Sequence, residues 1–396
     1  MNAKIIGVAF VFVFFQFSAL CQNWEIEWEK KMGTQNLDVF TDVIQNSDGG
    51  FMVIGTTFPE GKQDMDFWLV NFSSTGEVSW SKTMGTTNND FPSSLEQCPD
   101  DGYIITGKTQ VGDNLYNAFL LKTDKDGNEV WQKVLEKSGW QNATNVIVTN
   151  DGNFVVSGEM LTENGNKNIW LAQFSGKGEL IWVKNFGDDK EATPGALKKL
   201  PDGSFTMAGQ ISEKGSKDDD LWVFRFNKNG DKIWDTQIKS PNIIVWPECI
   251  CCSPDSNIVS VGWYGTCMND IKSEDAVFDF DLFITEISPK GKFLWTKNID
   301  SEGSEGGNAV VVRPDGNILL AGKKETSFLG RIGPWLLLTD RNGKVLSEFV
   351  LPFNFSGDQA AEIINTSDGG FVVIGPGKID FNKTRSDGWI RKFKAF

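Results

Sequence analysis

The 396-residue sequence contains no histidine, and this absence narrows the chemistry that the chain could perform. Without an imidazole, the chain lacks the usual general base, the Ser/His and Cys/His nucleophile systems and the commonest zinc ligand. It also has no glycine-rich phosphate loop and no GxSxG nucleophile motif. Carboxylates, thiols and aromatic side chains remain as candidates.

Among the carboxylates, Asp279 and Asp281 are the pair that could serve a glycoside hydrolase. The turn at Asp124 looks like part of an EF-hand calcium loop, but Lys122 would stand at its first ligand position, so the ligand register fails. We assign no catalytic residue, no metal and no cofactor to the chain.

Four cysteines cluster in one part of the sequence: Cys249, Cys251, Cys252 and Cys267. Because an oxidising compartment permits disulfides, we expect Cys267 to pair with Cys249. Zinc is the competing explanation of the cluster. Alternating strand residues point to opposite faces, however, and this opposes a tetrahedral site.

Four aromatic residues are the candidate ligand-binding residues: Trp140, Trp246, Trp263 and Tyr264. The three tryptophans lie outside the repeated positions described next. Exposed aromatics on one face suit sugar rings or a peptide, because a flat apolar surface excludes water at little entropic cost. The alternative is that they plug one face of the fold or brace an enlarged loop.

A repeat of about 50 residues positions these side chains. Each copy has a tight turn, a short apolar strand ending in glycine, an aromatic residue and, in most copies, a second glycine turn with a tryptophan four residues later. The first turns fall at Asp48, Asp101, Asp151, Asp202, Asp255, Asp315 and Asp368. Asp-Gly pairs supply the positive φ that tight hairpins require.

The aromatic residue that follows each strand-ending glycine is expected to pack between neighbouring repeats rather than to stack on a ligand. These residues are Trp68, Phe119, Trp170, Trp222, Phe283, Trp335 and Trp389.

The seventh copy stops at Phe396, before its last strand, whereas the segment 25–33 matches 78–85 in its Trp, Lys, Met and Gly. Seven copies and one N-terminal strand predict an all-β fold, a seven-bladed β-propeller of four-stranded antiparallel blades. The N-terminal strand completes the C-terminal blade and closes the ring. We expect residues 22–396 to form this single domain, as a monomer.

Three consecutive patterns, DGGFxVxG, DxWLxxF and GxxxWxKxxG, resemble those of exported bacterial β-propeller repeat proteins and, more distantly, of WD40-type propellers. The segment from Asp124 to Trp131 is also similar to the tryptophan-docking repeat of quinoprotein alcohol dehydrogenases. Cys251 and Cys252 resemble the adjacent cysteines that some of those enzymes place beside the cofactor, but we find no match for the family's calcium ligands. The resemblance implies a fold rather than an activity.

Residues 1–21 resemble a secretory signal peptide, with an apolar run from Ile5 to Phe15 and a cleavage site before Gln22. Lipidation of Cys21 is the less favoured alternative because Leu20 is a poor residue in front of it. We therefore expect an exported protein, periplasmic or extracellular, without a transmembrane segment. A net charge of −15 disfavours nucleic acid as a partner.

Function in propellers collects on variable loops, and the connection from Gly262 to Phe283 spans 21 residues where the other six blades have 12 to 14. We expect a non-catalytic propeller that binds a protein or glycan partner through this loop face. The alternative is a carbohydrate-active enzyme or a quinoprotein-like dehydrogenase. Carboxylates converging in the central channel would favour glycoside hydrolysis, and small apolar side chains there would favour binding alone.

Overall fold

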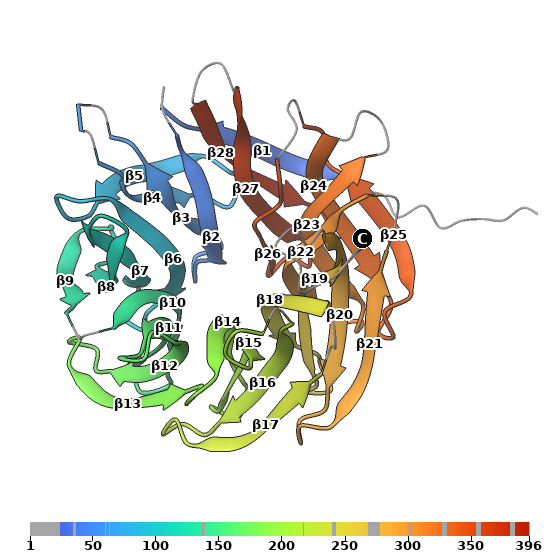
Figure 1. Cartoon of the computed structure of the whole chain (residues 1–396). Helices are drawn as coiled ribbons and strands as arrows, with labels where there is room; N and C mark the ends of the chain where they lie inside the picture. Colours follow the sequence, from blue (N-terminus) through green and yellow to red (C-terminus); the bar gives the residue numbers. More distant parts are fainter. Residues whose placement is uncertain are drawn as a thin grey trace, which may run out of the picture.

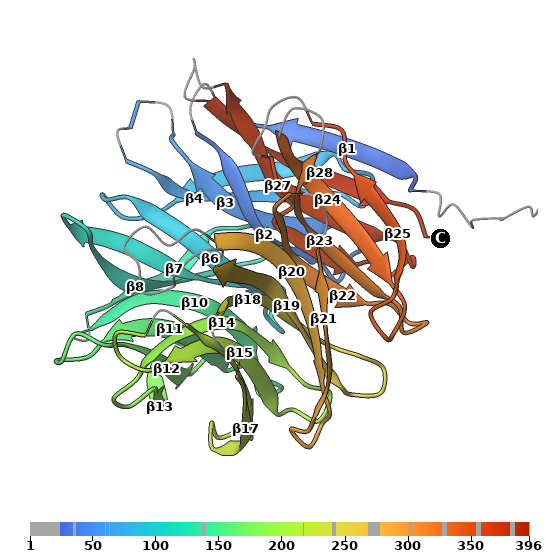
Figure 2. The same cartoon turned by 45° about the vertical axis from the view of Figure 1, so that its right-hand side comes forward.

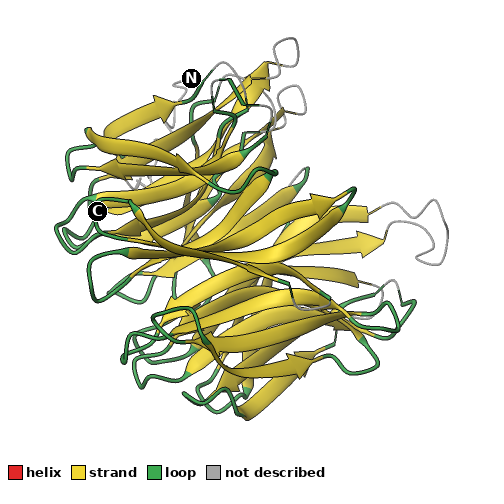
Figure 3. Cartoon of the chain, turned by 90° about the vertical axis from the view of Figure 1, so that its left-hand side faces the viewer, coloured by secondary structure: helices red, strands yellow, loops and turns green. Residues whose placement is uncertain are grey.

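The computed structural model describes residues 24–34, 37–59, 61–62, 64–136, 139–216, 218–239, 243–267, 278–300, 303–326, 331–353, 358–380 and 385–395. Within these ranges the chain forms seven four-stranded antiparallel sheets around one axis, joined by turns and loops (Figures 1 and 3). The predicted seven-bladed β-propeller is confirmed. The predicted leader lies outside the described residues. No helix in the described ranges is long and apolar enough to cross a membrane.

Six blades use four consecutive strands each, ordered from the ring axis outwards. Blade 1 consists of β2 (Val39–Gln45), β3 (Phe51–Thr57), β4 (Asp66–Phe72) and β5 (Val78–Met84). Blade 2 consists of β6 (Asp90–Gln97), β7 (Tyr103–Gly112), β8 (Leu115–Thr123) and β9 (Glu129–Leu135). Blade 3 consists of β10 (Trp140–Val148), β11 (Phe154–Leu161), β12 (Lys167–Phe174) and β13 (Leu180–Phe186). Blade 4 consists of β14 (Glu191–Lys199), β15 (Phe205–Ser212), β16 (Asp220–Phe226) and β17 (Lys232–Ile238). Blade 5 consists of β18 (Ile243–Cys252), β19 (Ile258–Cys267), β20 (Phe278–Ile287) and β21 (Phe293–Ile299). Blade 6 consists of β22 (Glu305–Val312), β23 (Ile318–Thr326), β24 (Arg331–Thr339) and β25 (Val345–Val350).

Blade 7 combines both ends of the chain. It contains β26 (Glu362–Asn365), β27 (Phe371–Asp380), β28 (Arg385–Phe393) and, outermost, β1 (Ile26–Met32). The strand β1 lies beside β28 (Figures 1 and 2). The two strands pair antiparallel, with Lys31 opposite Trp389. The Arg391 guanidinium donates a hydrogen bond of 3.0 Å from Nε to Glu29 Oε2 across this pair. The predicted closure of the ring by the N-terminal strand is confirmed.

The first turn of each blade contains one residue with positive φ, and glycine takes this place in five blades, as at Gly49 (φ 86°). In blade 2 the residue is Asp101 itself (φ 60°). The aspartate equivalent to Asp48 is therefore Asp100, one position earlier than the sequence predicted, because aspartate tolerates the left-handed conformation.

The repeated aromatic of the third strand is buried in every blade, with at most 8% of its surface exposed, so its predicted place between blades is confirmed. Trp170 is fully buried and stacks on Trp140, with ring centroids 4.2 Å apart and planes inclined by 2°.

In every blade except blade 6, a second tryptophan on the outermost strand packs against the next blade. The ring of Trp80 on β5 lies against Gly127 in the second turn of blade 2, where a Cβ atom would stand 2.3 Å from the indole. Gly127 also has a positive φ of 72°. The same contact joins Trp28 to Gly76, Trp131 to Gly178, Trp182 to Gly230, Trp234 to Gly291 and Trp295 to Gly343. Glycine is therefore required at these turns by backbone conformation and by the neighbouring indole.

Blade 6 departs from this pattern because blade 7 has no second turn for a tryptophan to meet. Ser347 stands where the tryptophan would be, and its hydroxyl accepts a 3.0 Å hydrogen bond from Trp24 Nε1. Trp24 precedes β1 and stacks on Phe349 at 5.9 Å. The exception in the sequence thus marks the junction where the two ends of the chain meet.

We predict that Trp170→Ala lowers the free energy of unfolding by about 3–5 kcal/mol, because it leaves a cavity and removes the stacking partner of Trp140. Denaturant unfolding with unchanged m-value measures the loss. Leu115→Ala, at a side chain that is 57% exposed, is the control and should change stability by less than about 0.5 kcal/mol. A loss of similar size in both variants would contradict the placement of Trp170.

Candidate functional site

The innermost strand of blades 1 to 6 carries a β-bulge near its start. In blade 1 the register breaks between Phe40 and Asp42, so that Thr41 has no partner on β3. Equivalent breaks occur at Pro92/Ser94, Ala143/Asn145, Pro194/Leu197, Pro247/Cys249 and Gly307/Ala309. A bulge redirects a side chain out of the regular alternation. Here it turns an additional residue of each strand toward the ring axis.

Two rings of side chains follow the bulges. The first contains the residue six positions before each turn aspartate, namely Asp42, Ser94, Asn145, Ala196, Cys249, Ala309 and Glu362. Because strand side chains alternate, the residue two positions later shares this face. That second ring contains Ile44, Glu96, Ile147, Lys198, Cys251, Val311 and Ile364. Acidic, basic and thiol groups therefore meet at the axis from five different blades.

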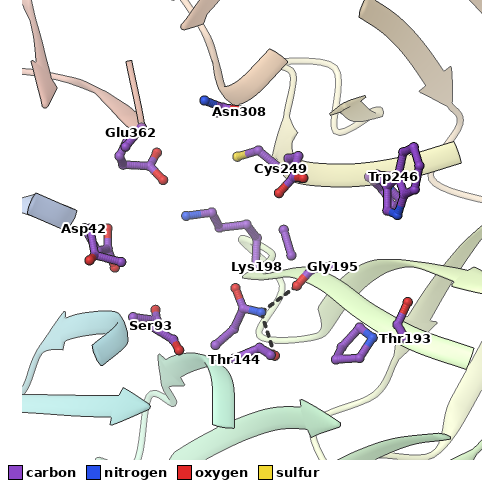
Figure 4. A pocket seen from close by; sticks show the side chains of 18 of the residues that line it. Asp42, Ser93, Thr144, Thr193, Gly195, Lys198, Trp246, Cys249, Asn308 and Glu362 are labelled. Atoms are coloured by element: carbon purple, nitrogen blue, oxygen red, sulfur yellow. Dashed lines mark hydrogen bonds between the residues drawn. The ribbon is translucent and has the colours of Figure 1, made fainter. Parts of the chain in front are cut away.

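A cavity of about 620 Å³ lies in this part of the channel (Figure 4). Its lining is mostly hydroxyl, amide and charged side chains, including Ser93, Thr144, Thr193, Asn308 and Gln359. The channel is therefore not lined by small apolar residues. A concave site with many hydrogen-bonding groups is suited to a polar small ligand.

Two tryptophans form one side of the cavity. Trp246 on β18 and Trp263 on β19 are direct cross-strand partners. Trp263 is held by blade 6: its Nε1 donates to Asn308 Oδ1 at 3.2 Å, and the Lys323 amine lies 3.7 Å from the ring centroid. A Cβ atom on Gly306 would come within 2.5 Å of the same indole, so only glycine permits this approach.

Lys198 is the basic residue near the axis. Its side chain extends from β14 toward the space between Asp42 and Glu362 (Figure 4). The side chain is open to solvent, although the channel wall surrounds it. Desolvation by the surrounding wall favours the neutral amine and would lower the pKa of Lys198. The carboxylates of Glu362, Asp42 and Glu96 have the larger, opposite effect, so the pKa of Lys198 is raised. The amine is therefore cationic.

The acids that face Lys198 hold their protons more tightly than free carboxyl groups. Desolvation raises the pKa of Glu362 to about 7 and that of Glu96 to about 7, against the opposing effect of Lys198. Desolvation also raises the pKa of Asp42, which nevertheless accepts backbone hydrogen bonds from Val43 (2.7 Å) and Leu95 (2.9 Å). The site thus holds more carboxyl groups than amines that could pair with them.

Hydrogen bonds between neighbouring blades fix the lining. Asn145 donates to the Gly195 carbonyl at 2.6 Å, and Asn308 donates to the Ala360 carbonyl at 2.8 Å. Gln210, on the second strand β15 of blade 4, donates to the Val245 carbonyl of blade 5. Side chains of the cavity wall therefore also hold the ring together, and the site is organised before any ligand binds.

The structure brings two of the four predicted aromatic residues together. Trp246 and Trp263 line the cavity, whereas Trp140 and Tyr264 do not. The expectation that Trp140 is exposed is wrong: only 2% of it is accessible, because it stacks on Trp170. Tyr264 follows Trp263 on β19, so it points to the opposite face, where it is 9% exposed and hydrogen-bonded to Asp281.

The expected disulfide between Cys249 and Cys267 is not formed. Cys249 is a free thiol, and its strand partner is Val261, six residues before Cys267. Six strand residues span about 20 Å, far beyond the reach of a disulfide. The side chain of Cys267 and residues 268–277 of the enlarged loop lie outside the described residues.

The predicted acid pair lies away from the cavity. Asp281 is buried beside Tyr264, and burial, together with Asp300 and Asp279, raises its pKa to about 6. Within the described ranges, no group of three or more His, Cys, Asp or Glu residues is arranged to hold a metal ion. The acids that line the cavity, Asp42, Glu248 and Glu362, were not predicted.

The fold and the site together define a seven-bladed β-propeller with a charged, aromatic-walled cavity at its axis. No protein-family model matches the chain, and no curated protein does either. The comparison with solved structures therefore provides the nearest points of reference.

Three solved structures illustrate the similarity. A protein of unknown function from Dyadobacter fermentans shares 10% identity at a TM-score of 0.53, over 93% of this chain and 99% of that one. The GH93 α-L-arabinofuranosidase of Fusarium graminearum, in complex with arabinobiose, shares 11% at 0.52, over 92% and 96%. Puromycin hydrolase shares 14% at 0.55, over 88% of this chain but only 52% of that one. Similarity at this level shows the fold alone.

We predict that Glu362→Gln removes part of the pH dependence of stability. A pKa of about 7, raised from 4.5, means that the folded protein binds more protons than the unfolded chain between these values. Stability from this group therefore falls as pH rises through that window. The melting temperature of the variant relative to wild type should increase by about 1–3 °C between pH 5 and pH 8. A constant difference across this range in calorimetry would contradict the assignment.

Proposed function

We propose that the protein is a non-catalytic binding propeller that takes a short glycan segment into the channel cavity. The observation that carries this proposal is the pair Trp246 and Trp263 on one side of an otherwise polar cavity. Sugar rings present apolar C–H faces and a rim of hydroxyl groups. Indoles suit the faces, and the hydroxyl and amide side chains around them suit the rim.

The size and rigidity of the site support a glycan over a protein surface. A cavity of about 620 Å³ lies in the range of small-ligand pockets and encloses only a few sugar units. Its lining is held by contacts between blades, such as Asn308 to Ala360, so little ordering is needed on binding. A protein partner would instead use the outer loops of the same face.

Export through the predicted leader belongs to this proposal and rests on the sequence. Cleavage before Gln22 would leave β1 within a few residues of the mature N-terminus. Mass spectrometry of the protein from its native host should find Gln22 as the first residue. An intact Met1 in the mature protein would refute export by this route.

We predict that Trp246→Ala and Trp263→Ala each weaken glycan binding by about 10–100-fold, equivalent to about 1.4–2.8 kcal/mol. A glycan array selects the ligand, and calorimetry measures the affinity of each variant. Phe293→Ala on the outer strand β21 is the matched control, since its side chain is 43% exposed and distant from the channel strands. Equal affinity in wild type and both tryptophan variants, with melting temperatures preserved, would refute the site.

Hydrolysis is the second candidate, and the pair Asp42 and Glu362 favours it because glycoside hydrolases use two carboxyl groups. Glu362 holds a proton near neutral pH, as a general acid must. The bound glycan is therefore also assayed for new reducing ends. Binding without cleavage is the expected result. Cleavage that disappears in Glu362→Gln while binding persists would establish the hydrolase instead.

A further inference from the structure

Three carboxyl groups, of Asp42, Glu248 and Glu362, and one amine, of Lys198, line the cavity, and the charges of Glu96 and Lys323 act on them from nearby. Lys198 faces Asp42, Glu96 and Glu362, and at the tryptophan side Lys323 faces Glu248. These four acids and two amines leave a surplus of two negative charges when all are ionised. The thiols nearby do not alter this balance, because burial raises the pKa of Cys249 to about 12 and keeps it neutral.

The two amines do not fully pair the acids. No carboxylate oxygen of the three acids around Lys198 comes within 4.0 Å of its amine, although all four side chains are among the described residues. The Lys323 amine makes a cation–π contact with the Trp263 ring, 3.7 Å from the ring centroid. Carboxyl groups without an ion-pair partner therefore remain at Asp42 and Glu362, which lie at the end of the cavity opposite Trp246 (Figure 4).

We propose that the ligand is a glycan that carries free amino groups, in other words an amino sugar whose ammonium group contacts Asp42 and Glu362 from the cavity. This inference rests on the proposed function and specifies its ligand. An ammonium group there would donate charge-assisted hydrogen bonds to carboxylates that form no ion pair with Lys198. An N-acetylated sugar of the same length would offer only a neutral amide at that point and would gain none of this attraction.

Binding of the ammonium group should also release protons. A positive charge beside Glu362 and Glu96 favours their ionised forms and lowers the pKa of each from about 7. Near pH 6 these groups are largely protonated in the free protein, so binding should expel on the order of one proton per ligand. A ligand held by stacking and neutral hydrogen bonds alone would not produce this signal.

The test compares a β-1,4-linked glucosamine tetramer with its N-acetylated counterpart by calorimetry at pH 6, in two buffers of different ionisation enthalpy. We expect the free amine to bind about tenfold or more tightly and to release protons. Glu362→Gln and Asp42→Asn should each abolish the preference, whereas Glu163→Gln, an exposed acid outside the cavity, should retain it. Melting curves confirm that each variant is folded.

Each outcome decides one question. Equal binding of both tetramers, or tighter binding of the N-acetylated one, overturns the amine inference and leaves the proposed glycan function standing. Equal binding of a tetralysine peptide shows that positive charge alone is recognised and also overturns it. A preference for the free amine that persists in Glu362→Gln and Asp42→Asn overturns the assigned position. If neither tetramer nor any glycan on the array binds, the proposed function itself fails.

Discussion

The contact between an outer-strand tryptophan and the glycine of the next blade's second turn is the constraint on which the ring depends. Each indole covers a backbone position where no side chain fits, so neighbouring blades can approach only in one register. Large aromatic surface is buried at little entropic cost, because an indole has few rotatable bonds. The contact recurs at six junctions. At the remaining junction, Trp24 and Ser347 replace it because the two chain ends meet there.

Because the contacts on the outer strands hold the blades together, the residue types on the innermost strands can differ between blades. The positions that face the axis are constant from blade to blade, but their residues range from alanine to aspartate, cysteine and glutamate. The charge of Lys198 in blade 4 interacts with the acids of blades 1, 2 and 7. Bulges that precede these positions turn still more polar groups toward the axis. The repeated strands thus fix where side chains meet at the axis, and the residues that differ between blades provide the chemical groups there.

The architecture could be predicted from the sequence because turns, glycines and tryptophans are dictated by backbone conformation and by contacts that recur in every blade. The closing strand was found by the same logic. The site was largely missed, since Asp42, Glu96, Lys198 and Glu362 interrupt no pattern when each repeat is considered alone. Their common signal is spacing: six or four residues before the turn aspartate. The misplacement of that aspartate at Asp101 rather than Asp100 would have hidden Glu96 even from this count.

Other errors have a different physical origin. Trp140 stands outside the repeated columns, but tertiary stacking on Trp170 buries it, and no local pattern reports such a contact. The cysteine cluster suggested a covalent link, whereas the strand register separates Cys249 from Cys267. Proximity in sequence is a weak guide to proximity in a sheet, because a strand extends by about 3.3 Å with every residue.

The closing blade also imposes an order on biosynthesis. The pairing of Glu29 with Arg391 joins residues 362 positions apart, so β1 remains unpaired until β28 has been synthesised. Contacts of such long separation slow folding, and an unpaired strand is a template for aggregation. A chain interrupted anywhere before β28 would therefore retain open sheet edges, so closure of the ring depends on the synthesis of blade 7.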